Sequence, residues 1–188
     1  MYRKTNKGEE TQRLFFALWP PPDAARALHE WAQAAHAAAG GRVTRKETIH
    51  LTLAFLGDVA HARVEALIDL ANRVHARPFD LVLDEARCWA HNGIVWVGPR
   101  EMPEALRDLA TQLDAALKAA GFRTEKRDFK AHLTLLRKAA PGAALPHLPA
   151  VSWRAGEFVL VRSALGAEGP AYSTLARFAL GRRVAPAG

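Results

Sequence analysis

Residues 49–57 read IHLTLAFLG, and the letters HLTL return in AHLTLLRK at residues 131–138. Each copy holds one histidine, His50 or His132, at the start of an apolar run with the length and composition of a β-strand. We interpret the two copies as equivalent parts of a duplicated fold that place two histidines at one site.

Side chains alternate between the two faces of a strand, so residues two positions apart share a face. In the first copy this groups His50 with Thr52, and in the second it groups His132 with Thr134, while the leucines point the other way. A polar pair on an apolar strand costs free energy unless it lines a wet cleft or is fully hydrogen-bonded. One such strand is typical of a hydrogen-bonded core histidine, whereas a matched pair of strands favours a functional site.

The sequence around the two copies also matches. Residues 37–57 read AAAGGRVTRKETIHLTLAFLG, and residues 118–138 read KAAGFRTEKRDFKAHLTLLRK. The order strand, helix, glycine, basic loop and histidine strand runs from 13 to 57 and again from 94 to 138. Two copies of this length do not form a solenoid, so we expect two lobes related by a pseudo-two-fold axis that sets the histidines opposite each other.

Hydrophobic periodicity, glycine and proline predict the other elements. We expect helices at 23–41, 60–76 and 102–121, and strands at 13–19, 79–91, 93–98, 156–166 and 171–181 in addition to the motif strands near 49–57 and 131–137. Asn92 and Gly93 are the expected turn of a hairpin. The chain is then a single bilobal domain at 13–182, with a flexible tail at 1–12 and a C-terminal tail at 183–188.

The chain of 188 residues has a formal net charge of +7, which favours an anionic partner such as nucleic acid or a nucleotide. The basic residues gather beside both motifs: Arg42, Arg45 and Lys46 before the first, and Arg123, Lys126, Arg127, Lys130, Arg137 and Lys138 around the second. We interpret this clustering as an electrostatic funnel for phosphate.

The single cysteine, Cys88, excludes an internal disulfide framework and is typical of a protein of the reducing cytoplasm. No segment approaches the ~20 unbroken apolar residues of a membrane span. The polar start of the chain lacks the apolar block of a signal peptide. We therefore expect a cytoplasmic protein with no membrane association.

Two histidines that face one phosphate can work as a base and an acid in one displacement at phosphorus. Threonine hydroxyls and an arginine can donate hydrogen bonds to the phosphate oxygens as negative charge builds. The chain lacks the His-Glu-x-x-His spacing of a zinc site, the nucleophile elbow, the phosphate loop and the dinucleotide fingerprint. We therefore expect acid–base chemistry with no metal and no cofactor.

The paired His-x-Thr-x motifs resemble those of the two-histidine phosphoesterases, and specifically the bacterial and archaeal RNA 2′,3′-cyclic phosphodiesterases, also called 2′-5′ RNA ligases. The resemblance runs from RLFFALWPP (13–21) through both motifs to YSTLARFAL (172–180). Ala131 stands where the family usually has proline, and Lys46 and Thr48 stand where it often has Pro-x-Asn. These differences lie in the loops that approach the histidines.

The resemblance implies a bilobal α+β fold, with two antiparallel sheets flanked by helices and a central cleft. It implies hydrolysis of RNA 2′,3′-cyclic phosphate ends to a 2′-phosphate, with His50 as proton donor and His132 as proton acceptor. Thr52 and Thr134 would then hold the phosphate. The repeat alone leaves the order of the two histidines open.

Three further residues are candidate substrate contacts: Arg137, Phe16 and Tyr172. Arg137 lies an odd number of residues after His132, so in a straight strand it would face away from the site, and we expect the strand to end before it. The two aromatic residues are candidates for stacking on a nucleobase.

Three alternatives stay open at this point. The chain could be a non-catalytic module that binds RNA ends or nucleotides, or it could join RNA ends by 2′-5′ ligation with the same histidines. Its real substrate could also be a small cyclic nucleotide or a 2′-5′ oligonucleotide. The expected partners are RNA with 2′,3′-cyclic phosphate ends, tRNA fragments among them, or small cyclic nucleotides. We expect the protein to act as a monomer.

Overall fold

The apolar run that follows Arg13 forms most of β1 (Thr11–Leu18), which lies between β9 and β3 in the main sheet. The computed structural model describes residues 10–125, 128–166 and 169–181. Strand β1 begins at Thr11 and so includes the last two residues of the segment 1–12 that the sequence assigns to an N-terminal tail. The predicted C-terminal tail at 183–188 lies outside the described residues.

The strands form two antiparallel sheets, one of eight strands and one of two. The main path of the large sheet runs β10 (Gly169–Ala179), β9 (Glu157–Gly166), β1, β3 (Leu51–Ala60), β7 (Leu133–Arg137), β6 (Ile94–Gly98) and β5 (Glu85–Trp89), and β2 (Arg42–Val43) pairs with β7. The small sheet pairs β4 (Phe79–Leu83) with β8 (Val151–Ala155). The expected α+β class with two antiparallel sheets is confirmed.

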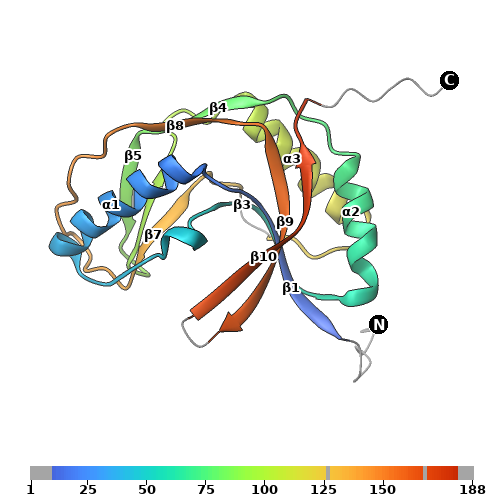
Figure 1. The fold of residues 1–188 in the computed structure, drawn as a ribbon, viewed down its shortest axis with the longest axis horizontal. Helices are drawn as coiled ribbons and strands as arrows, with labels where there is room; N and C mark the ends of the chain where they lie inside the picture. The colour runs from blue at the N-terminus through green and yellow to red at the C-terminus, as the bar shows by residue number, and fades with distance from the viewer. Residues whose placement is uncertain (1–9, 126–127, 167–168, 182–188) are drawn as a thin grey trace.

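The helices are α1 (Pro22–Ala39), α2 (Val64–Asn72) and α3 (Glu104–Ala119), with short 3₁₀ turns η1 (Lys46–Thr48) and η2 (His61–Arg63). Helix α1 packs against β7 and β8, whereas α3 packs against β3 and α2 (Figure 1). Their apolar faces join the inward-facing leucines of the sheet in one core. A second, smaller apolar cluster of Phe15, Ala17, Val159 and Val161, with Trp19, Phe55 and Tyr172 packed against it, lies apart from this core.

The predicted duplication is visible in the order of elements, because β1, α1 and β3 are repeated as β6, α3 and β7. The two motif strands are neighbours in the sheet, and Leu51 of β3 pairs with Leu133 of β7. These leucines directly follow His50 and His132. The pseudo-two-fold axis therefore passes between equivalent positions of the two copies, as the matching sequence predicts.

The segment at 79–91 differs from its prediction as one long strand. It is divided into β4, which pairs with β8, and β5, which pairs with β6 in the large sheet. The break is at Asp84, whose carboxylate accepts a hydrogen bond from the backbone N–H of Arg100 at 2.8 Å. The turn at Asn92 and Gly93 is confirmed, with Gly93 at a φ of +62°.

Candidate active site

The two histidines are held by the same local geometry. His50 Nδ1 lies 2.7 Å from the carbonyl oxygen of Thr48, and His132 Nδ1 lies 2.8 Å from that of Lys130. In each case the acceptor is the residue two positions earlier, just before the motif strand begins. A carbonyl oxygen can only accept, so each Nδ1 carries the proton and Nε2 is the atom that can exchange protons with a substrate.

The motif threonines complete the arrangement. Leu51 pairs with Leu133 in the antiparallel ladder. One residue to either side of this pair, the same register sets His50 opposite Thr134 and Thr52 opposite His132. Residues opposite each other have Cβ atoms about 5 Å apart, and diagonal neighbours lie about 7–8 Å apart. The two imidazoles are the diagonal pair, a spacing that leaves room for one phosphoryl group between them.

A cavity of about 310 Å³ contains these four side chains. Its lining residues are Arg42, Val43, Thr44, Arg45, Thr48, His50, Thr52, Trp89, Asn92, Ile94, His132, Thr134, Arg137, Gly169, Pro170 and Tyr172. In the described part of the chain no Asp or Glu lines this cavity, whereas three arginines do. The cavity is therefore electropositive and suited to a phosphate.

The surroundings of the two imidazoles differ. The ring of His50 contacts the rings of Phe15, Trp19 and Tyr172, with centroids 4.9, 5.6 and 5.3 Å away. Burial against this aromatic wall is the main reason why the pKa of His50 falls from 6.5 to about 4, and the charges of Arg137 and His132 lower it further. His50 is consequently neutral in the free protein at neutral pH.

Arg137 reaches the cavity because β7 contains a bulge. Trp96 pairs with Thr134 and the preceding Val95 pairs with Leu136, so β7 has one extra residue at this point. The extra residue reverses the alternation and turns Arg137 to the same side as Thr134. The expectation that the strand ends before Arg137 is wrong, because β7 runs to that residue.

The two aromatic candidates have different outcomes. Tyr172, on β10, lines the cavity beside His50, and burial raises the pKa of its hydroxyl, which stays protonated and can donate a hydrogen bond. Phe16 is 0% exposed and packs against Phe158 and Phe178 in the main core. The prediction that Phe16 stacks on a nucleobase is therefore wrong, and its neighbour Phe15 is the residue that faces His50.

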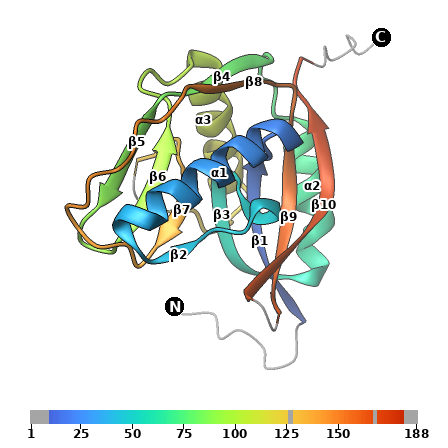
Figure 2. The same cartoon turned by 60° about the vertical axis from the view of Figure 1, so that its left-hand side comes forward.

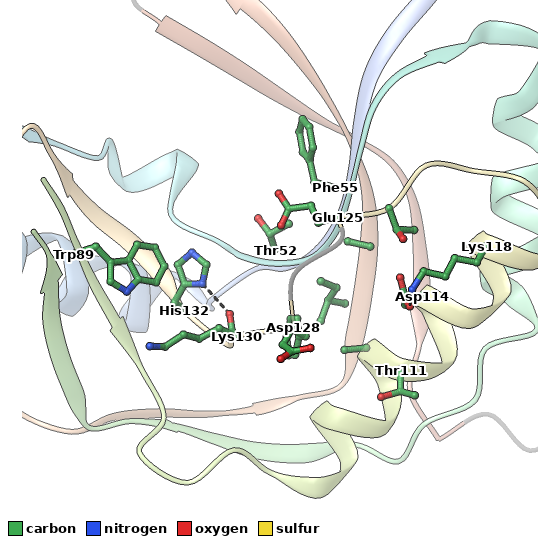
Figure 3. Close-up of a pocket in the computed structure, with 15 residues that line it drawn as sticks. Thr52, Phe55, Trp89, Thr111, Asp114, Lys118, Glu125, Asp128, Lys130 and His132 are labelled. Atoms are coloured by element: carbon green, nitrogen blue, oxygen red, sulfur yellow. Dashed lines mark hydrogen bonds and ion pairs between the residues drawn. The ribbon is translucent and has the colours of Figure 1, made fainter. Parts of the chain in front are cut away.

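A second cavity, of about 530 Å³, adjoins the first and shares Thr52, Trp89 and His132 with it. Figure 3 shows Trp89 and His132 at one side of it and Asp114, which pairs with Lys118, at the other. His132 therefore lines both adjoining cavities, whereas His50 lines only the first.

Three residues of the site were missed as candidates from the sequence. Phe15, Trp19 and Trp89 contact the histidines but lie in apolar strands or at a strand end, where aromatic side chains are typical of a core. Strand parity separates Phe15 from Phe16, yet parity cannot tell which of them faces the core when the whole run is apolar.

The pKa of His50 leads to a prediction for the pH dependence of activity. A pair of histidines that works as acid and base is active with one proton shared between the two imidazoles, and for such a pair a second proton, bound here by His50, would abolish the active form. Because kcat/KM reports the free enzyme, its acid limb is expected near pH 4, well below the value of about 6.5 for an ordinary histidine. A bound phosphate anion should raise the pKa of His50 and move the acid limb of kcat to higher pH.

Initial rates between pH 3.5 and 8, with circular dichroism at each pH to show that the protein stays folded, measure both limbs. An acid limb of kcat/KM at pH 6 or above would contradict the burial of His50.

Facing histidines with hydroxyl and guanidinium donors in an electropositive cavity form a site for phosphoester chemistry. The model of the family described as LigT like Phosphoesterase matches the chain at residues 18–96 and again at 97–172. The chain belongs to this family. The resemblance seen in the motifs is thus confirmed, and the two matches follow the two halves of the duplication.

Relatives and solved structures agree. The RNA 2′,3′-cyclic phosphodiesterase of Escherichia coli is 35% identical over 173 residues, which are 91% of this chain and 98% of that protein. The enzyme of the same name from Thermus thermophilus is 31% identical over 182 residues, 89% of this chain and 90% of its own length. Escherichia coli LigT in complex with 3′-AMP superimposes with a TM-score of 0.87 at 34% identity, covering 92% of this chain and 100% of that one.

Two further findings concern the described residues alone. None of their helices combines the length and the apolar character needed to span a membrane. No three of their His, Cys, Asp and Glu side chains come together in a group that could hold a metal ion.

Proposed function

We propose that this protein hydrolyses RNA 2′,3′-cyclic phosphate ends to 2′-phosphates by acid–base catalysis with His50 and His132. The observation that carries the proposal is the pair of imidazoles in one electropositive cavity, each with its Nδ1 fixed by a backbone carbonyl. The name shared by the relatives from Escherichia coli and Thermus thermophilus supports the substrate.

In the proposed reaction, His132 Nε2 takes a proton from a water molecule whose oxygen attacks phosphorus. As the new P–O bond forms, the bond from phosphorus to O3′ breaks, and His50 Nε2 gives its proton to the departing oxygen. The product carries a 2′-phosphate and a free 3′-hydroxyl. Exchange of protons with solvent then restores the starting state of both histidines.

The order of the histidines is supported by their surroundings. Both imidazoles contact aromatic rings, His50 those of Phe15, Trp19 and Tyr172 and His132 those of Trp89 and Trp96. His132 also lines the second cavity, from which we propose that water reaches it, whereas His50 lines only the first. A histidine with a low pKa is a strong acid once protonated. The phosphate anion supplies the opposite charge that favours the protonated form of His50 in the complex.

The other polar residues of the cavity have proposed roles in holding the phosphate. Thr52 and Thr134 lie beside the reacting atoms and donate hydrogen bonds from their hydroxyls to the non-bridging oxygens. Arg137 adds a positive charge close to His50, where negative charge develops. The hydroxyl of Tyr172 donates a further hydrogen bond from the β10 side of the cavity.

The test of this function is a hydrolysis assay on an RNA oligonucleotide that ends in a 2′,3′-cyclic phosphate, with and without EDTA. We expect conversion to the 2′-phosphate at the same rate in both conditions, because the two histidines supply the acid and the base. The position of the product phosphate is read by ³¹P NMR. Binding of the oligonucleotide without turnover would favour the non-catalytic module, and loss of activity in EDTA would contradict the metal-independent reaction.

The proposal includes two properties of the molecule as a whole. The catalytic cavity is built from one chain, so we propose that the protein acts as a monomer, which sedimentation at micromolar concentration checks. We also propose a cytoplasmic location, where RNA fragments are available as substrates; the single cysteine is in keeping with that reducing compartment.

A further inference from the structure

Two arginines lie opposite each other in the wall of the catalytic cavity. Arg42 of β2 pairs with Arg137 of β7 in the antiparallel ladder, and both side chains line the cavity. In Figure 2 the short strand β2 lies along β7. In the part of the chain that the structure describes, neither guanidinium forms an ion pair with a carboxylate.

This pairing is unfavourable in the free protein. Like charges directly opposite each other on a sheet destabilise it, and no Asp or Glu from the described residues lines the cavity to offset them. An anion placed between or beside the two guanidinium groups removes the repulsion. The arrangement is therefore typical of a binding site.

The position of Arg42 is fixed by close backbone packing. The preceding Gly41 has a φ of +84°, and a Cβ atom at that position would lie 2.5 Å from the carbonyl oxygen of Arg137. Two residues after Arg42, the backbone N–H of Thr44 donates to the carbonyl oxygen of Leu135 at 2.8 Å. Strand β2 is thus held against β7 on both sides of Arg42. The backbone packing therefore fixes the position of Arg42 opposite Arg137.

The cyclic phosphate accounts for only one of these two charges. A 2′,3′-cyclic phosphate is a diester with a single negative charge. The charge of Arg137 acts on His50, and so on the reacting phosphate. Arg42 lines the same cavity but is not among the charges that act on His50, so it is available to a second anionic group of the same substrate.

We propose that Arg42 forms a second anion subsite, which binds the phosphate on the 5′ side of the terminal nucleoside. This inference rests on the proposed function, since it takes the cyclic phosphate to lie between the histidines. The enzyme then selects for substrates with two phosphates, either an oligonucleotide end or a 5′-phosphorylated nucleoside cyclic phosphate. Small cyclic nucleotides with a single phosphate are poorer substrates.

The test compares two substrates that differ by one phosphate: adenosine 2′,3′-cyclic phosphate with and without a 5′-phosphate. The measured quantity is the ratio of their kcat/KM values. We expect Arg42→Ala to lower this ratio about 10- to 100-fold, the size of one charge-assisted hydrogen bond, and Arg42→Lys to keep part of it.

The matched control is Arg73→Ala, which removes the same charge from the exposed end of α2, outside both cavities. It should leave the substrate ratio at the wild-type value. An unchanged ratio in Arg42→Ala, or an equal fall of kcat/KM on both substrates, overturns the second subsite. If the substrate ratio falls by the same factor in Arg73→Ala, the effect is due to net charge, and the second subsite is also overturned.

A binding experiment separates this inference from the proposed function. In the His132→Ala background, calorimetry compares adenosine 3′,5′-bisphosphate with adenosine 3′-monophosphate. We expect tighter binding of the bisphosphate and loss of that preference on Arg42→Ala.

If wild-type protein hydrolyses neither cyclic substrate, the proposed function fails, yet a binding preference that depends on Arg42 still establishes the anion subsite. If hydrolysis proceeds and Arg42→Ala alters neither the kinetic ratio nor the binding preference, the subsite alone is rejected.

Discussion

Replacing His132 or His50 with alanine is expected to lower kcat on a 2′,3′-cyclic phosphate end by about 10²–10⁴-fold each, the contribution of one general acid or base. The physical reason is that each Nε2 is held in position by a fixed Nδ1 hydrogen bond, and water cannot replace a proton donor or acceptor so placed. Single-turnover kinetics with a labelled oligonucleotide measure the chemical step. The matched control is His36→Ala, an exposed histidine of α1 that lines neither cavity.

A substrate with sulfur in place of O3′ separates the acid from the base. A thiolate leaves without protonation far more readily than an alkoxide, since thiols have pKa values near 8.5. The loss in His50→Ala should therefore shrink to about tenfold or less on this substrate, whereas the loss in His132→Ala should persist. If the loss of activity in His132→Ala shrinks on the sulfur substrate and the loss in His50→Ala persists, then His132 is the acid and His50 is the base. Wild-type turnover in either variant on the natural substrate would end the acid–base proposal.

Phe16→Ala is expected to destabilise the protein by about 3–5 kcal/mol, the usual cost of truncating a buried phenylalanine. Phe16 is 0% exposed, and its ring packs against Phe158 and Phe178, so the substitution leaves a cavity in the main core. For a chain of this size the loss corresponds to a fall in Tm of roughly 6–20 °C. Thermal and urea unfolding followed by circular dichroism measure it.

Phe55→Ala is the comparison for this prediction, because Phe55 is only half-buried and lies under the guanidinium of Arg13. We expect a smaller loss of stability there. The position of the acid limb of kcat/KM should be the same in Phe16→Ala as in the wild type, provided that the assay temperature is below the lowered Tm. A stable Phe16→Ala variant with weakened substrate binding would restore the nucleobase contact that the structure argues against.

Most of the fold was accessible from the sequence because its signals are local. The alternation of His50 and Thr52 with leucines set the parity of β3, and the same alternation set that of His132 and Thr134. The duplication then predicted that the two strands meet, and the pairing of Leu51 with Leu133 shows that they do.

Errors arose where a run lacked alternation or where the chain departed from ideal geometry. The apolar run around Phe16 has no polar face, so the sequence could not assign Phe15 to the site and Phe16 to the core. A bulge opposite Val95 and Trp96 reversed the expected direction of Arg137, and bulges leave no periodic signal. The division of 79–91 into two strands depends on their partners, β8 and β6, which lie far away in the sequence.

By itself the sequence determined the two histidine strands, their parity, the duplication and the excess of positive charge, because each depends only on residue order and composition. The tertiary structure alone decided that His50 is enclosed by aromatic rings while His132 opens onto a second cavity, and that Arg42 stands opposite Arg137. Those features depend on which distant segments pack together. Packing is also what gives two residues with the same motif different environments, and hence different proposed roles.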